Sequence, residues 1–367
     1  MPYVEAVGCE LELRAPLLSP RGGNAPEANK SLPSGGGQQG ASSLYLGGGT
    51  PSLLSSEALH RLFFLIGQHA MLTKDAEVTI EANPDDVTPE WIASLKDTPI
   101  NRISMGVQSF NDAILHTLRR RHTAEQACKA VCMLHEAGYQ NISLDLIYGL
   151  PNQTIDDFIH DVRLALSLGI THLSAYALQY EQGTPLYNLR QQGTIQEADE
   201  ELSLNCYEHL IDLTAQAGME HYEISNFALP GYSSRHNSAY WADQPYVGLG
   251  AGAHSYAPSS NVRSYNCEDI QEYIRAISEG RLPATIETLS PTDRYNERVM
   301  LRLRTREGIA LPDIEHQFGT ERLDYLLRMA APHLQRGTLQ KKTDETLCLT
   351  RRGLFVSDDI ISDLLLA

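Results

Sequence analysis

Polar residues that could bind a ligand follow three short apolar runs in the first half of the chain. These segments are Gly47-Gly48-Gly49-Thr50-Pro51, Glu81-Ala82-Asn83-Pro84-Asp85 and Gly106-Val107-Gln108-Ser109-Phe110. Glycines let backbone N–H groups approach a carboxylate or phosphate, and a carboxylate followed by an amide can bind an ammonium group and hydroxyl groups. Together the segments predict a site for one polar ligand, although each taken singly is equally compatible with a structural turn or a helix cap.

Two charged residues could complete this site. Asp145 lies inside the apolar stretch 142–147, where a carboxylate is costly to bury unless it is paired. This position favours a functional role over a buried salt bridge. Arg120 precedes an expected helix start and could bind an anionic group, or the run 119–121 could form a solvated basic face.

A third cluster is rich in histidine, glycine and aromatic residues. It consists of Arg235-His236-Asn237-Ser238-Ala239-Tyr240-Trp241 and the stretch 246–255, which contains His254. Aromatic side chains beside a histidine could form a pocket for a large flat ligand, with the histidine as an iron ligand. Either histidine could instead serve only as a structural hydrogen-bonding group.

The cysteines predict neither a disulfide framework nor a metal site. They are scattered along the chain at Cys9, Cys128, Cys132, Cys206, Cys267 and Cys348. Cys128 and Cys132 are four residues apart on an expected helix, but no third cysteine follows nearby. We interpret this pair as part of a buried apolar stripe.

From residue 42 onward, short apolar runs alternate with longer helical periods. The expected strands are 43–46, 78–80, 102–107, 142–147 and 172–178, and the expected helices lie near 59–66, 89–97, 123–137, 154–168 and 196–217. This alternation predicts an α/β fold with parallel strands and right-handed crossovers. Ligands then bind at the carboxyl ends of the strands, where the polar segments lie.

The chain divides into five expected segments. The leading helix, 1–18, has apolar residues at helical spacing with Glu5, Glu10 and Glu12 between them, and a flexible Gly-, Pro- and Ser-rich loop follows at 19–41. The α/β region covers 42–230, and the His-, Gly- and aromatic-rich region with a connector covers 231–290. Residues 291–367 have the order three helices, a hairpin with its turn at Asp344-Glu345 and a final helix, which predicts a winged-helix-type module.

Composition excludes several classes of protein. The 367 residues carry a formal net charge of −17, which opposes binding to nucleic acid or to anionic lipid. The longest apolar run is 62–66, so no membrane span is expected, and the first residues do not resemble a secretory signal. We therefore expect a cytoplasmic protein.

The polar segments 47–51, 81–85 and 106–110 resemble the radical S-adenosylmethionine family. The segment 145–154 and the His236-Asn237-x-x-Tyr240-Trp241 stretch share this resemblance. The ordered combination is most similar to the HemW-type haem chaperones, relatives of oxygen-independent coproporphyrinogen oxidase. The resemblance runs from about residue 3 to the end. It implies a partial (β/α)6 barrel whose first strand is missing, followed by a C-terminal HemN-like domain of winged-helix type.

The resemblance also assigns roles to individual positions. Eight residues match the S-adenosylmethionine pocket: Gly48, Gly49, Thr50, Glu81, Gln108, Arg120, Asp145 and Ala177. The first three would contact the methionine moiety, and the glutamate would bind its amino group. The haem-binding candidates are His236, Asn237, Tyr240, Trp241 and His254, of which His236 begins the motif that distinguishes the chaperones.

One feature of the family is absent from the sequence. Members begin with a strand carrying Cys-x-x-x-Cys-x-x-Cys, whose three thiolates hold a 4Fe-4S cluster, and this chain has no such motif. We expect a truncated or wrongly started member. Three functions stay open: a chaperone that transfers haem to haem-requiring client proteins, an oxygen-independent coproporphyrinogen III oxidase of porphyrin biosynthesis, or an inactive remnant. The oxidase needs the cluster as its source of electrons.

Overall fold

The computed structural model describes residues 1–18, 40–343 and 345–366. The chain forms two compact units. The α/β unit consists of Tyr45–Leu54 and Glu77–Ser234, and the second unit consists of Met1–Leu44, Ser55–Ala76 and Arg235–Ala367. The expected flexible loop falls almost wholly outside the described residues, as does Asp344 of the expected hairpin turn.

A seven-stranded sheet contains the five strands that the alternating pattern predicts, and two further strands, β6 (Glu220–Glu223) and β7 (Asn226–Ala228), that it does not. Its order is β1 (Ala41–Leu46), β2 (Leu72–Ala82), β3 (Arg102–Gln108), β4 (Asn141–Tyr148), β5 (His172–Ala177), β7 and β6. Neighbouring strands from β2 to β5 are parallel, whereas β7 is antiparallel to β5 and to β6. The parallel part places several strand ends at one edge, as expected for an α/β fold.

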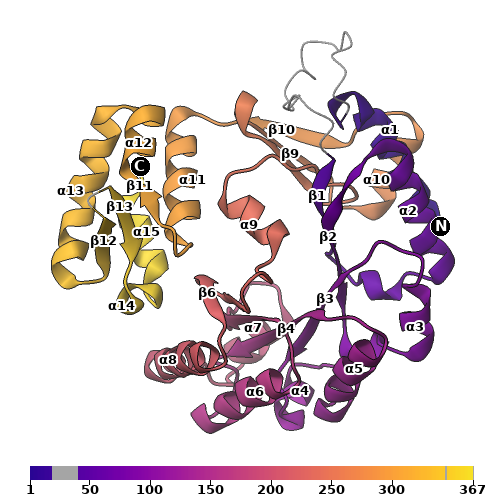
Figure 1. Ribbon diagram of the computed structural model, residues 1–367, viewed down its shortest axis with the longest axis horizontal. Coiled ribbons are helices and arrows are strands. Elements are labelled where there is room, and N and C mark those ends of the chain that lie inside the picture. Colours follow the sequence, from indigo (N-terminus) through magenta and orange to yellow (C-terminus); the bar gives the residue numbers. More distant parts are fainter. Residues whose placement is uncertain (19–39, 344, 367) are drawn as a thin grey trace. The chain divides into compact units, whose positions relative to one another are not determined.

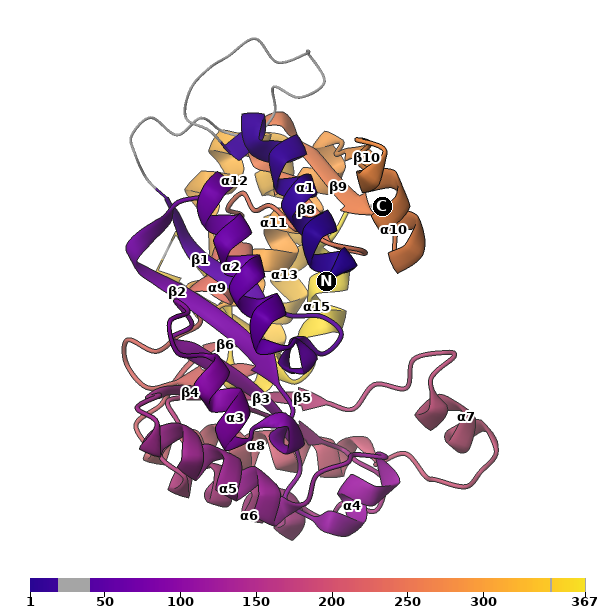
Figure 2. The same cartoon turned by 90° about the vertical axis from the view of Figure 1, so that its right-hand side faces the viewer.

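Helices connect the parallel strands. They are α3 (Pro89–Ser94), α4 (Asp112–Thr117), α5 (Ala124–Glu136), α6 (Ile155–Ser167), α7 (Pro185–Gln191) and α8 (Glu200–Gln216). Figure 1 shows α5, α6 and α8 on one side of the strands, and Figure 2 shows α7 set apart from the other helices of this unit. Thr123 and Thr154 begin α5 and α6 with capping boxes, which satisfy the free N–H groups of the first turns. The short helices α4 and α7 were not expected from the sequence.

The interpretation of the cysteine pair on α5 is wrong for one of its members. Cys132 is exposed, and Cys128 is only partly buried. The buried stripe of this helix consists of Ala127, Ala130, Val131 and Leu134. Spacing of four residues fits one helix face, but it does not show which face the sheet covers.

The second unit begins with α1 (Pro2–Leu18), which packs beside α2 (Ser56–His69) in both views (Figures 1 and 2). A Cβ at Gly8 would lie 2.7 Å from a methyl carbon of Leu65, so glycine permits the close approach of the two helices. The expected apolar residues Val4, Val7 and Leu11 are buried. Glu10, one of the three glutamates that lie between these apolar residues in the sequence, is completely buried as well.

A small antiparallel sheet covers this glutamate. It has the order β10 (Ala284–Thr288), β9 (Val262–Asn266) and β8 (His254–Ala257), and α10 (Ile270–Ser278) follows β9 in the chain. Asn266 at the end of β9 and Tyr273 on α10 both donate hydrogen bonds to the Glu10 carboxylate, at 2.8 and 2.7 Å. The carboxylate is therefore satisfied by partners that lie more than 250 residues away in the sequence.

The C-terminal residues have the expected order. They form α11 (Pro291–Leu303), β11 (Ile309–Ala310), α12 (Leu311–Phe318), α13 (Thr320–Arg336), β12 (Leu339–Thr343), β13 (Thr346–Leu349), α14 (Arg351–Leu354) and α15 (Ser357–Leu364). The final helix is thus divided in two, at Phe355 and Val356. Tyr295, Leu326 and Ile360 are among the residues of a buried core formed within this region. Within the described residues, no helix is long and apolar enough to cross a membrane.

Candidate functional site

Glu81, near the end of β2, fixes the glycine-rich loop that follows β1. The Tyr45 hydroxyl donates to Oε1 at 2.9 Å, and the Gly48 N–H donates to Oε2 at 3.0 Å. Gly48 and Gly49 have φ values of 76° and 61°, and a Cβ at either position would meet nothing within 4 Å. The left-handed backbone conformation, rather than crowding, therefore favours glycine here.

Arg120 joins the ends of β2 and β3. Its Nη2 donates to Oδ1 of Asn83 at 2.8 Å and to the carbonyl oxygen of Gly106 at 2.7 Å. A Cβ at Gly106 would lie 2.9 Å from Nε2 of Gln108 and 3.4 Å from Nη2 of Arg120, so this glycine leaves room for both side chains. The Arg120 Nε is buried without a hydrogen-bond partner among the described residues, and burial lowers the pKa of this guanidinium.

Asp145 lies in a row of residues that crosses three strands. The strand register places Gly106 of β3 beside Asp145 of β4, and Asp145 beside Ser174 of β5. Burial raises the pKa of Asp145 to about 6, although the Ser174 hydrogen bond and the charge of Arg102 favour its ionised form. A carboxyl group with a raised pKa beside the Arg120 contact at Gly106 is a candidate for a functional role.

The α/β unit thus contains every residue that the sequence assigns to the S-adenosylmethionine pocket. Gly48 contacts Glu81 directly, and Arg120 packs against Gly106 next to Gln108. Gln108 has a φ of 69° at a bulge in β3, which changes the direction of the strand at its end. Thr50 precedes the 3-10 turn Pro51–Leu53, and Ala177 is an exposed residue at the end of β5.

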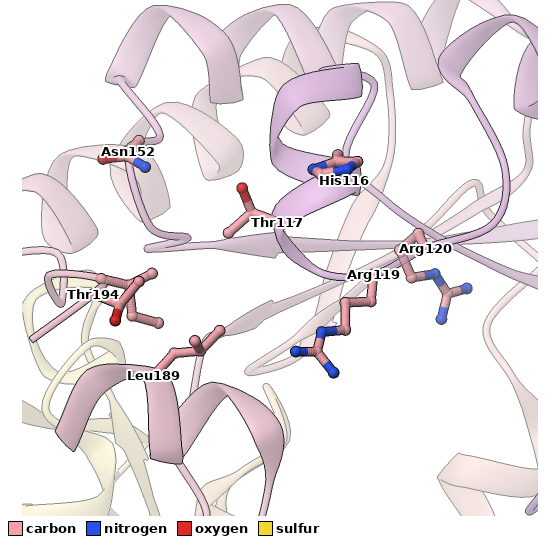
Figure 3. Close-up of a pocket in the computed structure, with 8 residues that line it drawn as sticks. His116, Thr117, Arg119, Arg120, Asn152, Leu189 and Thr194 are labelled. Atoms are coloured by element: carbon pink, nitrogen blue, oxygen red, sulfur yellow. The ribbon is translucent and has the colours of Figure 1, made fainter. Parts of the chain in front are cut away.

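A cavity of about 600 Å³ lies next to Arg120 in the same unit (Figure 3). It is lined by His116, Thr117, Arg119, Arg120, Asn152, Leu189, Thr194 and Ile195. Figure 3 shows His116 and Thr117 on α4 and Leu189 on α7. From this set the sequence selected only Arg120 as a site residue; the other residues come from α4, from α7 and from loops. The one signal for Asn152 is its place in the polar segment after β4.

The motif residues of the second unit lie on the short helix α9 (Arg235–Trp241). The His236 ring meets the Tyr240 ring edge-on with 4.8 Å between centroids, and its Nδ1 lies 3.3 Å from Oγ of Ser43. Tyr240 in turn meets Tyr246 at 4.6 Å. Burial raises the pKa of the Tyr240 hydroxyl to about 12. The series places aromatic rings next to a histidine, an arrangement that suits a flat ligand with a metal at its centre.

His254 has a different environment. It begins β8, is exposed, and stacks on the ring of Tyr265 with 5.5 Å between centroids. Asn237 and Trp241 belong to α9 itself, and Trp241 is covered by the guanidinium of Arg304. Of the two histidine candidates, His236 is therefore the one that belongs to the aromatic series.

Two family models match the chain. Residues 35–165 match the radical SAM superfamily, and residues 289–356 match the HemN C-terminal domain. The structure resembles the solved coproporphyrinogen III oxidase HemN of Escherichia coli, with a TM-score of 0.79 over 99% of this chain and 82% of that chain, at 23% identity. The fold and the strand-end site therefore define a radical SAM protein.

Relatives of known name identify the branch of the radical SAM superfamily to which the chain belongs. The heme chaperone HemW of Lactococcus lactis is 39% identical over 75% of this chain and 72% of its own length. The heme chaperone HemW of Bacillus subtilis is 34% identical over 88% of this chain and 85% of its own length. The chain belongs to the HemW family of radical SAM proteins.

Membership of the superfamily implies S-adenosylmethionine and a 4Fe-4S cluster as cofactors. The residues of the α/β unit fit the first, because Gly48, Gly49 and Glu81 form a polar loop and Arg120 has a buried, unpartnered Nε. The residues of this chain do not fit the 4Fe-4S cluster. All six cysteines are free, and no group of three cysteine, histidine or acidic side chains in the described part of the chain could hold a metal ion.

Proposed function

We propose that this protein binds haem at the α9 motif, transfers it to haem-requiring proteins, and binds S-adenosylmethionine at the strand ends of the α/β unit. Support for the haem role comes from the relatives named heme chaperone, at 34–39% identity over most of the chain. The observation that carries the proposal is the contact series from His236 through Tyr240 to Tyr246.

The chemistry of this series suits haem. An imidazole nitrogen is a common axial ligand of haem iron, and aromatic side chains pack against the flat macrocycle. The contact of His236 Nδ1 with Ser43 Oγ orients the imidazole ring beside the aromatic series. Asn237, Tyr240 and Trp241 would contact the haem beside His236. His254, which lies outside the aromatic series, would be a further haem contact.

Replacing His236 with alanine tests this proposal. We expect the wild-type protein to shift the Soret band of added haem, and the variant to bind haem at least about tenfold more weakly, because an axial ligand is lost. The measurement is a spectroscopic titration of the purified protein with haem. The matched control is His209→Ala, which removes an exposed histidine on α8. A Soret shift that is unchanged in the His236 variant would assign the iron to another residue.

When bound, S-adenosylmethionine would supply an adenosyl group attached to a positively charged sulfonium. In this chain, Gly48, Gly49 and Thr50 would contact the methionine moiety, and Glu81 would bind its ammonium group. Gln108, Arg120, Asp145 and Ala177 would complete the pocket. The support is the hydrogen-bonded arrangement of the partly buried side chains of Glu81 and Arg120 at neighbouring strand ends.

Replacing Glu81 with alanine should weaken the binding of S-adenosylmethionine by about tenfold to a hundredfold. The change removes an acceptor for a charged ammonium group, and it releases the Tyr45 hydroxyl and the Gly48 N–H. Isothermal titration calorimetry of the purified protein measures the affinity. Glu90→Ala, an exposed carboxylate in the first turn of α3, is the control. Equal affinities for the wild type and the Glu81 variant would remove Glu81 from the pocket.

A further inference from the structure

Trp241, the last residue of α9, is covered by an arginine from the C-terminal region. The Cζ atom of Arg304 lies 5.2 Å from the centroid of the tryptophan ring. Arg304 itself directly follows α11 as its C-terminal cap. A guanidinium above an indole face is attracted by the π electrons of the ring. The contact therefore joins the α9 motif to the C-terminal region within the second unit.

Both stacked side chains carry a donor that the protein does not satisfy. The Nε1 of Trp241 and the Nε of Arg304 are buried, and neither has a hydrogen-bond partner among the residues that the structure describes. Buried N–H groups nearly always have a partner, because an unsatisfied donor costs free energy. These two donors lie on adjacent side chains, where acceptor groups of a ligand would satisfy them.

The ion pair between Arg304 and its acidic partner, Asp358, is weak. Its Nη1 lies 3.7 Å from Oδ1 of Asp358, whose side chain is 81% exposed. Exposed ion pairs of this kind contribute little to stability. The guanidinium of Arg304 therefore retains donor capacity for a carboxylate from outside the protein.

Two neighbouring arginines, Arg294 and Arg298, share one buried carboxylate within the protein, although the Nε of Arg298 also has no partner among the described residues. The buried carboxylate of Asp243 accepts from Nη1 and Nη2 of Arg294 at 3.2 and 3.0 Å, and from Nη2 of Arg298 at 2.8 Å. Nη2 of Arg298 also donates to Gln317 at 3.1 Å. Of these three arginines, Arg304 is the one whose carboxylate partner among the described residues is distant and exposed.

We propose that Arg304 binds a propionate carboxylate of haem held at the α9 motif. This inference rests on the proposed haem-binding function and adds a specificity-determining residue from the C-terminal region. Haem carries two propionates beside its flat ring, and a guanidinium matches a carboxylate with two parallel hydrogen bonds. The chain has a formal net charge of −17, so an anionic ligand requires a local cation of this kind.

The test compares haem with haem dimethyl ester, in which both propionates are esterified and uncharged. Both are titrated into the full chain in the same detergent buffer, and the Soret shift gives the two affinities. We expect wild-type protein to bind haem about tenfold or more tightly than the ester. Arg304→Gln should weaken haem binding to the level of the ester and leave ester binding unchanged. Arg304→Lys, which keeps the charge but not the planar fork, should retain part of the preference.

The control is Arg306→Gln, which removes the same charge two residues away. Arg306 is 48% exposed and pairs with the adjacent Glu307 at 3.2 Å, so its loss should leave the preference for haem intact. Equal weakening of haem and ester in the Arg304→Gln protein, or no weakening of either, overturns the inference while the proposed function stands. Absence of a Soret shift for wild-type protein with both compounds overturns the proposed function, and the inference with it.

Discussion

Replacing Glu10 with alanine is expected to lower the free energy of unfolding by about 3 to 5 kcal/mol, the cost of leaving a buried charge without its partner. Oε1 of Glu10 accepts from Nε of Arg14 and from Nδ2 of Asn266, both at 2.8 Å. Oε2 accepts from the Gly250 N–H at 2.8 Å and from the Tyr273 hydroxyl at 2.7 Å. The variant therefore leaves a buried guanidinium, an amide, a hydroxyl and a backbone donor without this acceptor.

Chemical denaturation followed by circular dichroism measures the effect. Glu10→Gln keeps the shape and one acceptor, so it should lose less stability than the alanine variant. Glu12→Ala is the matched control on the same helix, since its side chain is 67% exposed, and it should change the stability by at most about 0.5 kcal/mol. If the Glu10 and Glu12 variants were equally stable, the buried network would contribute nothing to the fold.

Replacing Asp145 with asparagine is expected to stabilise the ligand-free protein at pH 7 by up to about 3 kcal/mol. The folded pKa of Asp145 is about 6, raised by burial from 3.8. One pKa unit corresponds to about 1.4 kcal/mol of free energy. Because the folded pKa is raised, the protonated form stabilises the fold below pH 4, and this contribution is lost as the pH rises through 6. Asparagine cannot ionise and should remove that loss.

Unfolding free energies measured between pH 4 and pH 7 test this expectation. Asp161 is also buried and also has a pKa raised to about 6, so the wild-type profile contains two groups, and the difference between wild type and variant isolates Asp145. Asp156→Asn, an exposed change in the first turn of α6, is the control. A variant that is less stable than wild type at pH 7, or that has the same pH profile, contradicts the assigned environment of Asp145.

Much of the fold could be predicted from local patterns. The alternation of apolar runs and helical periods determined strands β1 to β5 and the helices α5, α6 and α8, because burial against a sheet requires such periods. The order of the C-terminal helices and hairpin also followed from the sequence. Short elements such as α4 and α7 were missed, since six or seven residues carry too little periodicity to distinguish a helix from a loop.

The candidate site was predictable in composition but not in geometry. The sequence placed Gly48 and Glu81 at or near strand ends and Asp145 inside a strand, and the strand order confirms that these strands follow one another in one sheet. That Glu81 holds the Gly48 N–H and the Tyr45 hydroxyl became evident only from the tertiary structure. Such contacts depend on strand register, which local sequence does not fix.

By itself, the sequence determined the type of fold, the polar segments after the strands, the His236 motif and the lack of a three-cysteine cluster motif. The tertiary structure alone decided that Glu10 is buried, that Cys132 is exposed and that Arg304 covers Trp241. The physical reason is the range of the interactions. Helical and strand periods are set by residues a few positions apart, whereas the burial of a charge depends on partners such as Asn266, which lies 256 residues from Glu10.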